Sequence, residues 1–287
     1  MASATSIVAV SSLWGISLQQ PAAAYSPQVS TQTLSHDSAV LLSNRLRGYR
    51  FRVRSSRYRR GGIARGETCP SEVIASITPV SEDIQATATT YLGTSAHPTF
   101  FVNVPELPET TLKLSVQPLD LSAVDANGEL DPDQIDFRAF DYEKAIYEAE
   151  YVLASQMGGV VGLRVPSTAP PLELGTYYLW QVSVFCQPDG ADPMAQDDGM
   201  ILDGGIMERV EDTATGSADE RLTHYLSQGI WQDALSLVAA AYHAAPNDGA
   251  AAQDWADLME IAGLPAYQTQ PILAIQEGTL MWSVGEG

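Results

Sequence analysis

Cysteine is scarce in this chain, with two residues in 287, Cys69 and Cys186. Neither belongs to a C-x-x-C pair, and no histidine lies near them at metal-ligand spacing, so the sequence offers no cysteine-based zinc site. Two alternatives remain, a single disulfide or two buried thiols. Because the chain begins with an export-like segment, we expect a disulfide between Cys69 and Cys186.

Histidine is also rare, and the familiar catalytic motifs are absent. The four histidines are His36, His97, His224 and His243. None stands in H-E-x-x-H, and the chain contains no G-x-S-x-G elbow, P-loop or G-x-G-x-x-G. A triad assembled in space is still open, because triads are recognised by geometry. We expect no enzyme, with His97 ordering a turn and His224 and His243 on helices.

Nine of the fifteen basic residues lie in one short stretch, residues 45–65. Residues 1–65 hold nine arginines and one acid, a charge of about +8, whereas residues 66–287 hold six basic residues against thirty-four acids, about −28. The acidic part would repel nucleic-acid phosphates, so we expect no nucleic-acid partner. The basic part is suited to a protein partner, to other copies of the chain, or to an anionic envelope glycan.

No apolar run is long enough to span a bilayer. The run at residues 6–18 is followed by Pro21 and three alanines, a pattern that signal peptidase accepts, so residues 1–24 are expected to be a signal-like segment. No Lys or Arg precedes Arg45, which leaves cleavage open. We expect an exported protein, in the periplasm, at the cell surface or outside the cell, with no transmembrane helix.

Residues 25–65 are expected to form an arginine-rich arm or linker. Within it, residues 49–54 alternate apolar and basic side chains with period two, as a half-buried strand does. Such a strand could lie on its own acidic body or on the sheet edge of a neighbouring copy. Chance alternation in a disordered arm is equally open. The residues expected to make contacts are Arg50, Arg52, Arg54, Arg57, Arg59 and Arg60.

Residues 66–212 are expected to form an immunoglobulin-like antiparallel β-sandwich, because short strand patterns follow one another without helical periodicity. The aromatic and β-branched run at 176–186 should be the central strand. Leu172, Gly175 and Tyr177 resemble the corner at which immunoglobulin-like sandwiches begin a central strand. The predicted strands are 71–79, 98–104, 111–116, 146–153, 160–165, 176–186 and 205–210.

The periodicity becomes helical at residues 213–265. Ser217 and Glu220 form a capping box, Gly229 ends the first helix, and a second helix is expected over 231–244. A third follows, with Trp255 in it. The pattern resembles about one and a half tetratricopeptide (TPR) units. We expect a TPR-like helical cap, with a peptide-binding groove as the alternative, and a tail at 266–287.

One acidic loop is a candidate calcium site. Oxygen-bearing residues alternate along it, as Ca²⁺ requires, but its glycine falls at loop position four and leucine at position six, unlike an EF-hand. A solvated acidic loop is the default, and no other cofactor is expected. The candidate ligands are Asp125, Asn127, Glu129, Asp131 and Asp133.

Several distinctive sequence blocks follow one another across residues 59–265. The blocks are RRGG at 59–62, CP at 69–70, HPTFFVNVP at 97–105, VPSTAPPLELGTYYLW at 165–180, FCQP at 185–188, DGGIMERV at 203–210 and GIWQDAL at 229–235. In this order they resemble the DUF928 family. The resemblance implies a filamentous-cyanobacterial type of origin and export, and it agrees with the disulfide. The family has no established activity, so it supplies no functional residues.

Three function classes are compatible with the sequence. The first is a non-catalytic extracytoplasmic module that binds a partner, which the absence of catalytic motifs favours. The second is a self-assembling subunit of a surface filament or layer, favoured by a basic arm and an acidic body on one chain. The third, a hydrolase with a scattered site, has no motif in its favour.

Overall fold

The computed structural model describes residue 46 and residues 54–56, 74–80, 88–106, 110–119, 144–154, 158–185 and 200–284. The chain divides into two compact units, Met1–Ser35 and His36–Gly287. Every described residue lies in the second unit, which therefore contains every helix and strand described below.

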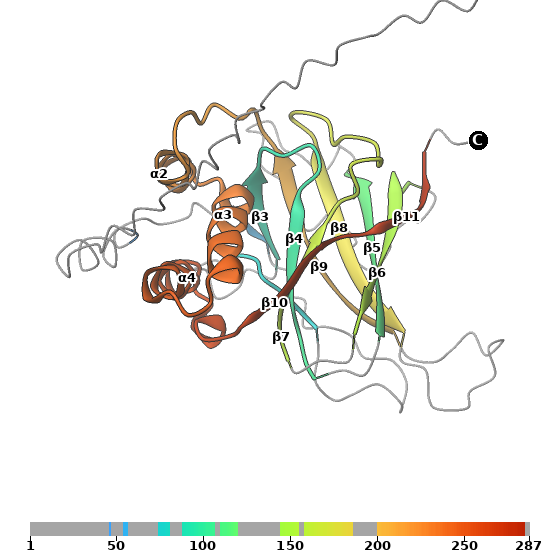
Figure 1. Cartoon of the computed structure of the whole chain (residues 1–287). Helices are drawn as coiled ribbons and strands as arrows, with labels where there is room; N and C mark the ends of the chain where they lie inside the picture. Colours follow the sequence, from blue (N-terminus) through green and yellow to red (C-terminus); the bar gives the residue numbers. More distant parts are fainter. Residues whose placement is uncertain are drawn as a thin grey trace, which may run out of the picture. The chain divides into compact units, whose positions relative to one another are not determined.

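Two β-sheets face each other in the second unit, whose described residues are mainly β with three α-helices (Figure 1). The seven-stranded sheet has, in spatial order, β1 (Arg54–Ser56), β3 (Ala88–Gly93), β9 (Met200–Arg209), β8 (Tyr177–Phe185), β5 (Thr110–Pro118), β6 (Tyr147–Leu153) and β11 (Thr279–Ser283). The four-stranded sheet has β10 (Ile272–Glu277), β7 (Gly159–Arg164), β4 (Thr99–Val104) and β2 (Ala75–Ser76). The expected sandwich-like, mainly β architecture is confirmed, and β8 is central as predicted.

The sheets meet through large buried side chains. Trp180 of β8 stacks on Phe100 of β4 with ring centroids 4.6 Å apart and 21° between the planes. The Trp180 Nε1 donates a hydrogen bond to the hydroxyl of Tyr91 in β3 at 2.6 Å. Alternate residues of β5, namely Leu112, Leu114 and Val116, are fully buried, which is the period of two that a packed sheet face requires. This core contains most of the apolar residues that predicted the strands.

A buried carboxylate also links the two sheets. Asp203 of β9, 4% exposed, accepts hydrogen bonds from the backbone N–H of Ser76 in β2 at 2.5 Å and of Gly204 at 2.8 Å. The Ser76 hydroxyl donates to the Gly204 carbonyl at 3.1 Å. Since a buried carboxylate must be hydrogen-bonded to be tolerated, these donors fix β2 over β9.

The expectation of an antiparallel sandwich is wrong for two strand pairs. β3 pairs with β9 in parallel, and β10 pairs with β7 in parallel. Parallel neighbours need a long connection, and more than a hundred residues separate the paired strands in each case. The other pairs are antiparallel, including β8 with β9 and β5 with β6.

The C-terminal residues expected as a tail supply one strand to each sheet. β10 lies along β7, and after Gly278 the chain passes to the other sheet as β11, along β6 (Figure 1). A Cβ on Gly278 would lie 2.6 Å from the ring of Tyr151, so only glycine fits where the chain changes sheets. The Tyr151 hydroxyl donates to the Arg164 carbonyl at 2.8 Å beside this crossing.

The three predicted helices are present, as α2 (Ala218–Gln228), α3 (Trp231–Ala244) and α4 (Gly249–Ile261). Ser217 and Glu220 form the expected capping box, and Gly229 ends α2 in a left-handed conformation with φ of 73°. In the described part of the chain, no helix combines the length and apolar content needed to cross a membrane.

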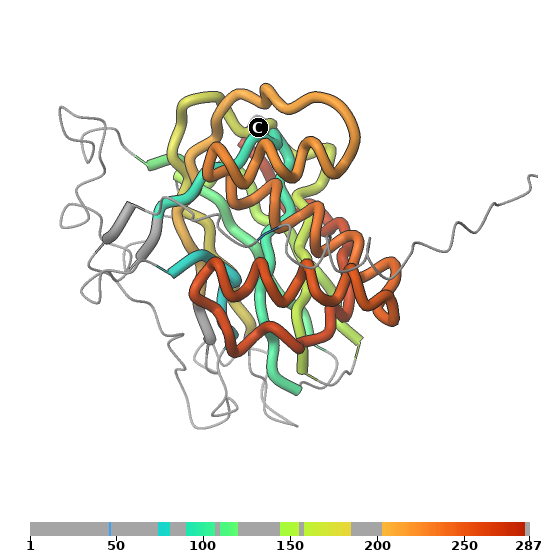
Figure 2. The backbone as a smooth tube through the Cα atoms, turned by 90° about the vertical axis from the view of Figure 1, so that its left-hand side faces the viewer, coloured from blue at the N-terminus to red at the C-terminus, as the bar shows by residue number. Residues whose placement is uncertain are grey.

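The helix layer, formed by α2, α3 and α4, packs beside β3, β4 and β10 through α3 (Figure 2, helices in orange and red). Trp231, fully buried, donates from Nε1 to the Ile77 carbonyl at 3.3 Å. The Gln232 amide donates to the Thr99 carbonyl of β4. A Cβ on Gly93 would come within 2.7 Å of Met207 Sδ and 3.0 Å of Gln232 Cβ. Glycine therefore lets α3 approach the end of β3.

The turn before β8 is bonded to a tyrosine, as the predicted immunoglobulin-like corner requires, but the tyrosine is Tyr178 and not Tyr177. Gly175 adopts φ of 71°, and Leu172 is buried. The Glu173 backbone N–H donates to the hydroxyl of Tyr178 at 2.7 Å. Tyr178, rather than the predicted Tyr177, makes this upstream contact, because Tyr178 is the residue whose side chain lies on the same face as Trp180.

Candidate functional site

Most residues proposed from the sequence lie outside the described part of the chain. These are Cys69 and Cys186, the acidic-loop residues Asp125, Asn127, Glu129, Asp131 and Asp133, His36, and the arm residues Arg50, Arg52, Arg57, Arg59 and Arg60. The disulfide and the calcium site therefore remain predictions. Among the residues that are described, no group of three or more His, Cys, Asp or Glu side chains is placed to hold a metal ion.

Arg54 begins β1, the one described strand of the arginine-rich arm. Arg54, Ser55 and Ser56 pair antiparallel with Thr90, Thr89 and Ala88 of β3. At these three residues the arm therefore lies on the sheet of its own chain, which is one of the two placements expected for a strand in the arm. The preceding residues 49–53 are outside the described part.

The three described histidines each bond to a neighbouring segment. His97 lies in a bend before β4, where its Nε2 is 2.9 Å from the Ala169 carbonyl and its backbone N–H donates to the Ser95 hydroxyl at 3.2 Å. The predicted role of His97 in ordering a turn stays a prediction, since its side chain bonds a carbonyl 72 residues away. His224 lies on α2 and His243 on α3, as expected, and the His243 Nδ1 is 3.0 Å from the Ile272 carbonyl.

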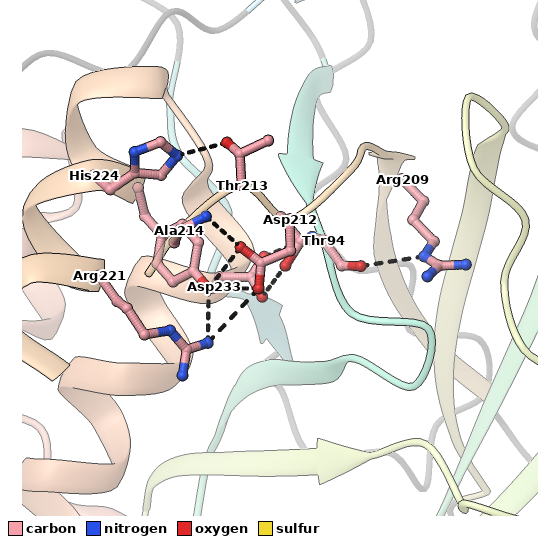
Figure 3. Close-up of polar contacts among 9 residues, drawn as sticks. Thr94, Arg209, Asp212, Thr213, Ala214, Arg221, His224 and Asp233 are labelled. Carbon is pink, nitrogen blue, oxygen red and sulfur yellow. Dashed lines mark hydrogen bonds and ion pairs between the residues drawn. The ribbon is translucent and has the colours of Figure 1, made fainter. Parts of the chain in front are cut away.

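Polar side chains from four segments meet where the helix layer joins the sandwich (Figure 3). We call Thr94, Asp212, Arg221, Tyr225 and Asp233 the junction cluster. Thr94 follows β3, Asp212 follows β9, Arg221 and Tyr225 lie on α2, and Asp233 lies in the first turn of α3. The cluster thus connects the ends of two neighbouring strands to two helices.

Asp233 holds the end of β3. Its two carboxylate oxygens accept one hydrogen bond each from Thr94, from the backbone N–H at 2.6 Å and from the hydroxyl at 2.8 Å. On the other side, Arg209 Nε donates to the Thr94 carbonyl at 3.1 Å, and the Arg209 guanidinium also donates to the Leu172 carbonyl. Thr94 is therefore fixed by both its backbone groups and its side chain.

Asp212 contacts two side chains of α2, Tyr225 and Arg221. The Tyr225 hydroxyl lies 3.1 Å and 3.3 Å from the two Asp212 oxygens, and Arg221 donates to that hydroxyl at 2.8 Å. Arg221 is also 3.8 Å from Asp212, a partly exposed ion pair worth little by itself. The Ala214 N–H donates to Asp212 at 3.0 Å. Beside this group, the Thr213 hydroxyl is 3.0 Å from His224 Nε2.

The two carboxylates of the junction cluster are close enough to interact electrostatically. Partial burial raises the pKa of Asp233, and the nearby charge of Asp212 raises it further, while the hydrogen bonds from Thr94 and the charge of Arg221 oppose the rise. Burial likewise raises the pKa of Tyr225, so its hydroxyl stays protonated and can donate to Asp212. The carboxylate oxygens of Asp212 and Asp233 thus accept hydrogen bonds that connect the helices to the sandwich.

The raised pKa of Asp233 predicts a specific pH dependence. Folding favours the protonated carboxyl, so the stability that Asp233 contributes is present below its unfolded pKa and is lost as pH rises through the folded value. We expect the free energy of unfolding of wild type minus that of Asp233→Asn to fall as pH rises above about 3.9, the ordinary pKa of an aspartate, in urea titrations at several pH values. In a Thr94→Val background the hydroxyl that bonds Asp233 and lowers its pKa is missing. The decrease in the stability difference should then extend to higher pH. A difference that rises with pH would contradict the assignment.

Exposed apolar side chains lie on and next to β11, an edge strand of the seven-stranded sheet. Of the five exposed large apolar residues among the described ones, Met281 (49% exposed) is in β11, Val284 (62%) directly follows it, and Val152 (63%) is on the neighbouring β6. β11 pairs with β6 on one side, and no described strand pairs with its other side. We call this strip of β11 and the exposed residues beside it the β11 edge.

The family model of the Domain of Unknown Function DUF928 matches residues 60–272, about three quarters of the chain. The chain belongs to the DUF928 family. No protein with a curated description matches it. Both edge strands of the seven-stranded sheet, β1 and β11, lie outside the span that the DUF928 model matches. The family match therefore covers the sandwich core and the helix layer but not the two sheet edges.

Neither the junction cluster nor the β11 edge is evident from the sequence. The cluster joins Thr94 to residues 212–233, and no local pattern connects them. The one available signal is Asp233 at the start of a predicted helix, where an acid is ordinarily explained by the helix dipole. The sequence of this DUF928 protein predicts a tail over residues 266–287, so the β11 edge has no counterpart among the predicted strands.

Proposed function

We propose that this DUF928 protein is a non-catalytic extracytoplasmic module that binds a protein partner through its β11 edge. The observation that carries the proposal is the exposure of Met281 in the edge strand β11 and of Val284 directly after it, with Val152 exposed on the neighbouring β6. An edge strand presents backbone N–H and C=O groups to an added strand, and pockets or apolar contacts beside it supply specificity. Apolar residues exposed together are typical of an interaction surface.

The remaining features of the proposal rest on the sequence and on local contacts. Export rests on the signal-like residues 1–24, and the expected disulfide suits that compartment. The Tyr178 hydroxyl bonded to Glu173 supports an immunoglobulin-like corner, and the α2–α3 pair supports a TPR-like segment. The carboxylates of the junction cluster accept hydrogen bonds from Thr94 and Tyr225, which suits a structural role better than a catalytic one.

A photo-crosslinking amino acid at position 281 tests this function. Placed in the full-length protein in the cells that make it, it should give one discrete product containing a second polypeptide. Position 174 is the matched control, because Leu174 is 56% exposed but lies in the turn before β8. Equal products from both positions, no product from position 281, or a product without a second polypeptide would contradict the proposal.

A second candidate function, a self-assembling subunit of a surface filament or layer, is favoured by one observation. The described part of the arginine-rich arm, β1, forms the other edge of the same seven-stranded sheet. A sheet with a basic segment at one edge and an exposed strand at the opposite edge could extend from copy to copy.

A further inference from the structure

The two edges of the seven-stranded sheet have opposite strand directions. Between β1 and β11 there are six pairings, of which the β3–β9 pairing is parallel and the other five are antiparallel. An odd number of antiparallel steps reverses direction, so β1 and β11 run opposite ways in the sheet. Two copies placed side by side in the same orientation would therefore bring β11 of one copy antiparallel to β1 of the next.

The sequence segments that contain the two edge strands also differ in charge. Nine arginines lie within residues 45–65, which flank and include β1 in the sequence, whereas the chain has no Lys or Arg after Arg221, so β10 and β11 carry no basic residue. Glu148 and Glu150 of β6 lie opposite Trp282 and Thr279 of β11. The ammonium group of Lys113 lies 3.7 Å from the Glu148 carboxylate and 3.3 Å from the Glu150 carboxylate, so one positive charge faces two negative charges. A basic strand is thus electrostatically matched to the β11 edge.

An isologous contact, with β11 of one copy on β11 of another, lacks this match. It would bring together two acidic surfaces of a region that carries about −28 over residues 66–287, and like charges close together oppose association. A contact between β11 and β1 joins opposite charges and buries Met281 and Val284, which are about half or more exposed in the single chain.

We propose that a second copy of this chain docks its β1 edge on the β11 edge of the first, in antiparallel pairing, so that the seven-stranded sheet continues across the contact. This inference rests on the proposed function, since it names the partner of the β11 edge. The contact is heterologous, because it joins different edges: the first copy still presents its β1 and the second its β11, each an end strand of the sheet among the described residues. Since strands in a sheet are twisted relative to each other, repeated addition gives a helical filament.

Sedimentation of the purified full-length protein tests the inference. The average mass of wild type should increase with concentration and decrease when salt is raised to about 1 M, where the Debye length is about 3 Å. Met281→Lys should raise the dissociation constant at least about tenfold, which corresponds to 1.4 kcal/mol. Leu174→Lys, with the same charge change at an equally exposed site away from the edge, should behave as wild type. Thermal melts check that both variants are folded.

Three results would overturn the inference. They are a wild type that stays monomeric at every concentration, a Met281→Lys variant that associates as wild type does, and growth that stops at a dimer. The crosslinker at position 281 separates this inference from the proposed function. A product that maps to residues around β1 of a second copy supports both proposals. A product with a different protein supports the proposed function and overturns the inference, whereas no product overturns both.

Discussion

Replacing Gly204 with alanine should destabilise the protein by about 3 kcal/mol or more, above the usual range for overpacking. Gly204 lies in β9 opposite Gln181 of β8, and a Cβ there would be 2.0 Å from the Trp180 carbonyl oxygen and 3.0 Å from the Gln181 Cα. Both neighbours are backbone atoms of the central strand. They can give way only by separating β8 from β9, and Asp203, which links the sheets, directly precedes the substitution.

The measurement for Gly204→Ala is the free energy of unfolding from urea titration, followed by tryptophan fluorescence. Gly249→Ala is the matched control, because a Cβ at Gly249 meets no atom within 4 Å and the residue is the first of α4. Alanine there should be neutral or stabilise by up to about 1 kcal/mol. A Gly204→Ala variant as stable as Gly249→Ala would show that β8 and β9 can separate at this point without cost.

Replacing Trp180 with alanine should lower the free energy of unfolding by about 3–5 kcal/mol, the range for removing a buried tryptophan. The side chain is 1% exposed, stacks on Phe100 of the opposite sheet and donates to the Tyr91 hydroxyl. Its removal leaves a cavity between the sheets and a buried hydroxyl that has lost its donor. Burial raises the pKa of Tyr91 strongly, so this hydroxyl cannot compensate by ionising.

The hydrogen bond can be separated from the packing by a double-mutant cycle. Trp180→Phe keeps a ring against Phe100 but removes the donor, and it should cost about 1–3 kcal/mol. Tyr91→Phe removes the partner. The double variant should cost less than the sum of the single variants, because no polar group is then left buried alone. Strict additivity in urea titration would mean that the Trp180–Tyr91 bond contributes nothing to stability.

The elements that the sequence predicts well are those with a strong local pattern. β8, with its run of aromatic and β-branched residues, lies where it was predicted and at the centre of its sheet. The helix boundaries agree with the capping box at Ser217, the left-handed Gly229 and the apolar spacing around Trp231. In each case the residues that determine the local backbone also face the core, so pattern and packing agree.

The elements that the sequence does not predict depend on contacts distant along the chain. β3 carries Tyr91 and Leu92 among threonine, alanine and glycine, a weak strand pattern that is stabilised by β9 and by the Tyr91 bond to Trp180. The direction of a strand relative to its neighbour has no local signal either, which is why the two parallel pairings differ from the expected antiparallel arrangement. The junction cluster is of the same kind, since Asp233 acquires its role only when Thr94 is brought to it.

The placement of β10 and β11 has a kinetic consequence. These two strands, almost the last residues of the chain, pair with β7 and β6, which were synthesised more than a hundred residues earlier. Native contacts between such distant residues slow folding, because the entropy of closing long loops must be overcome before the pairing stabilises anything. Neither sheet can be completed before residues 272–283, which contain β10 and β11, have been synthesised. The two sheets should therefore be completed slowly, and only after β11 has been synthesised.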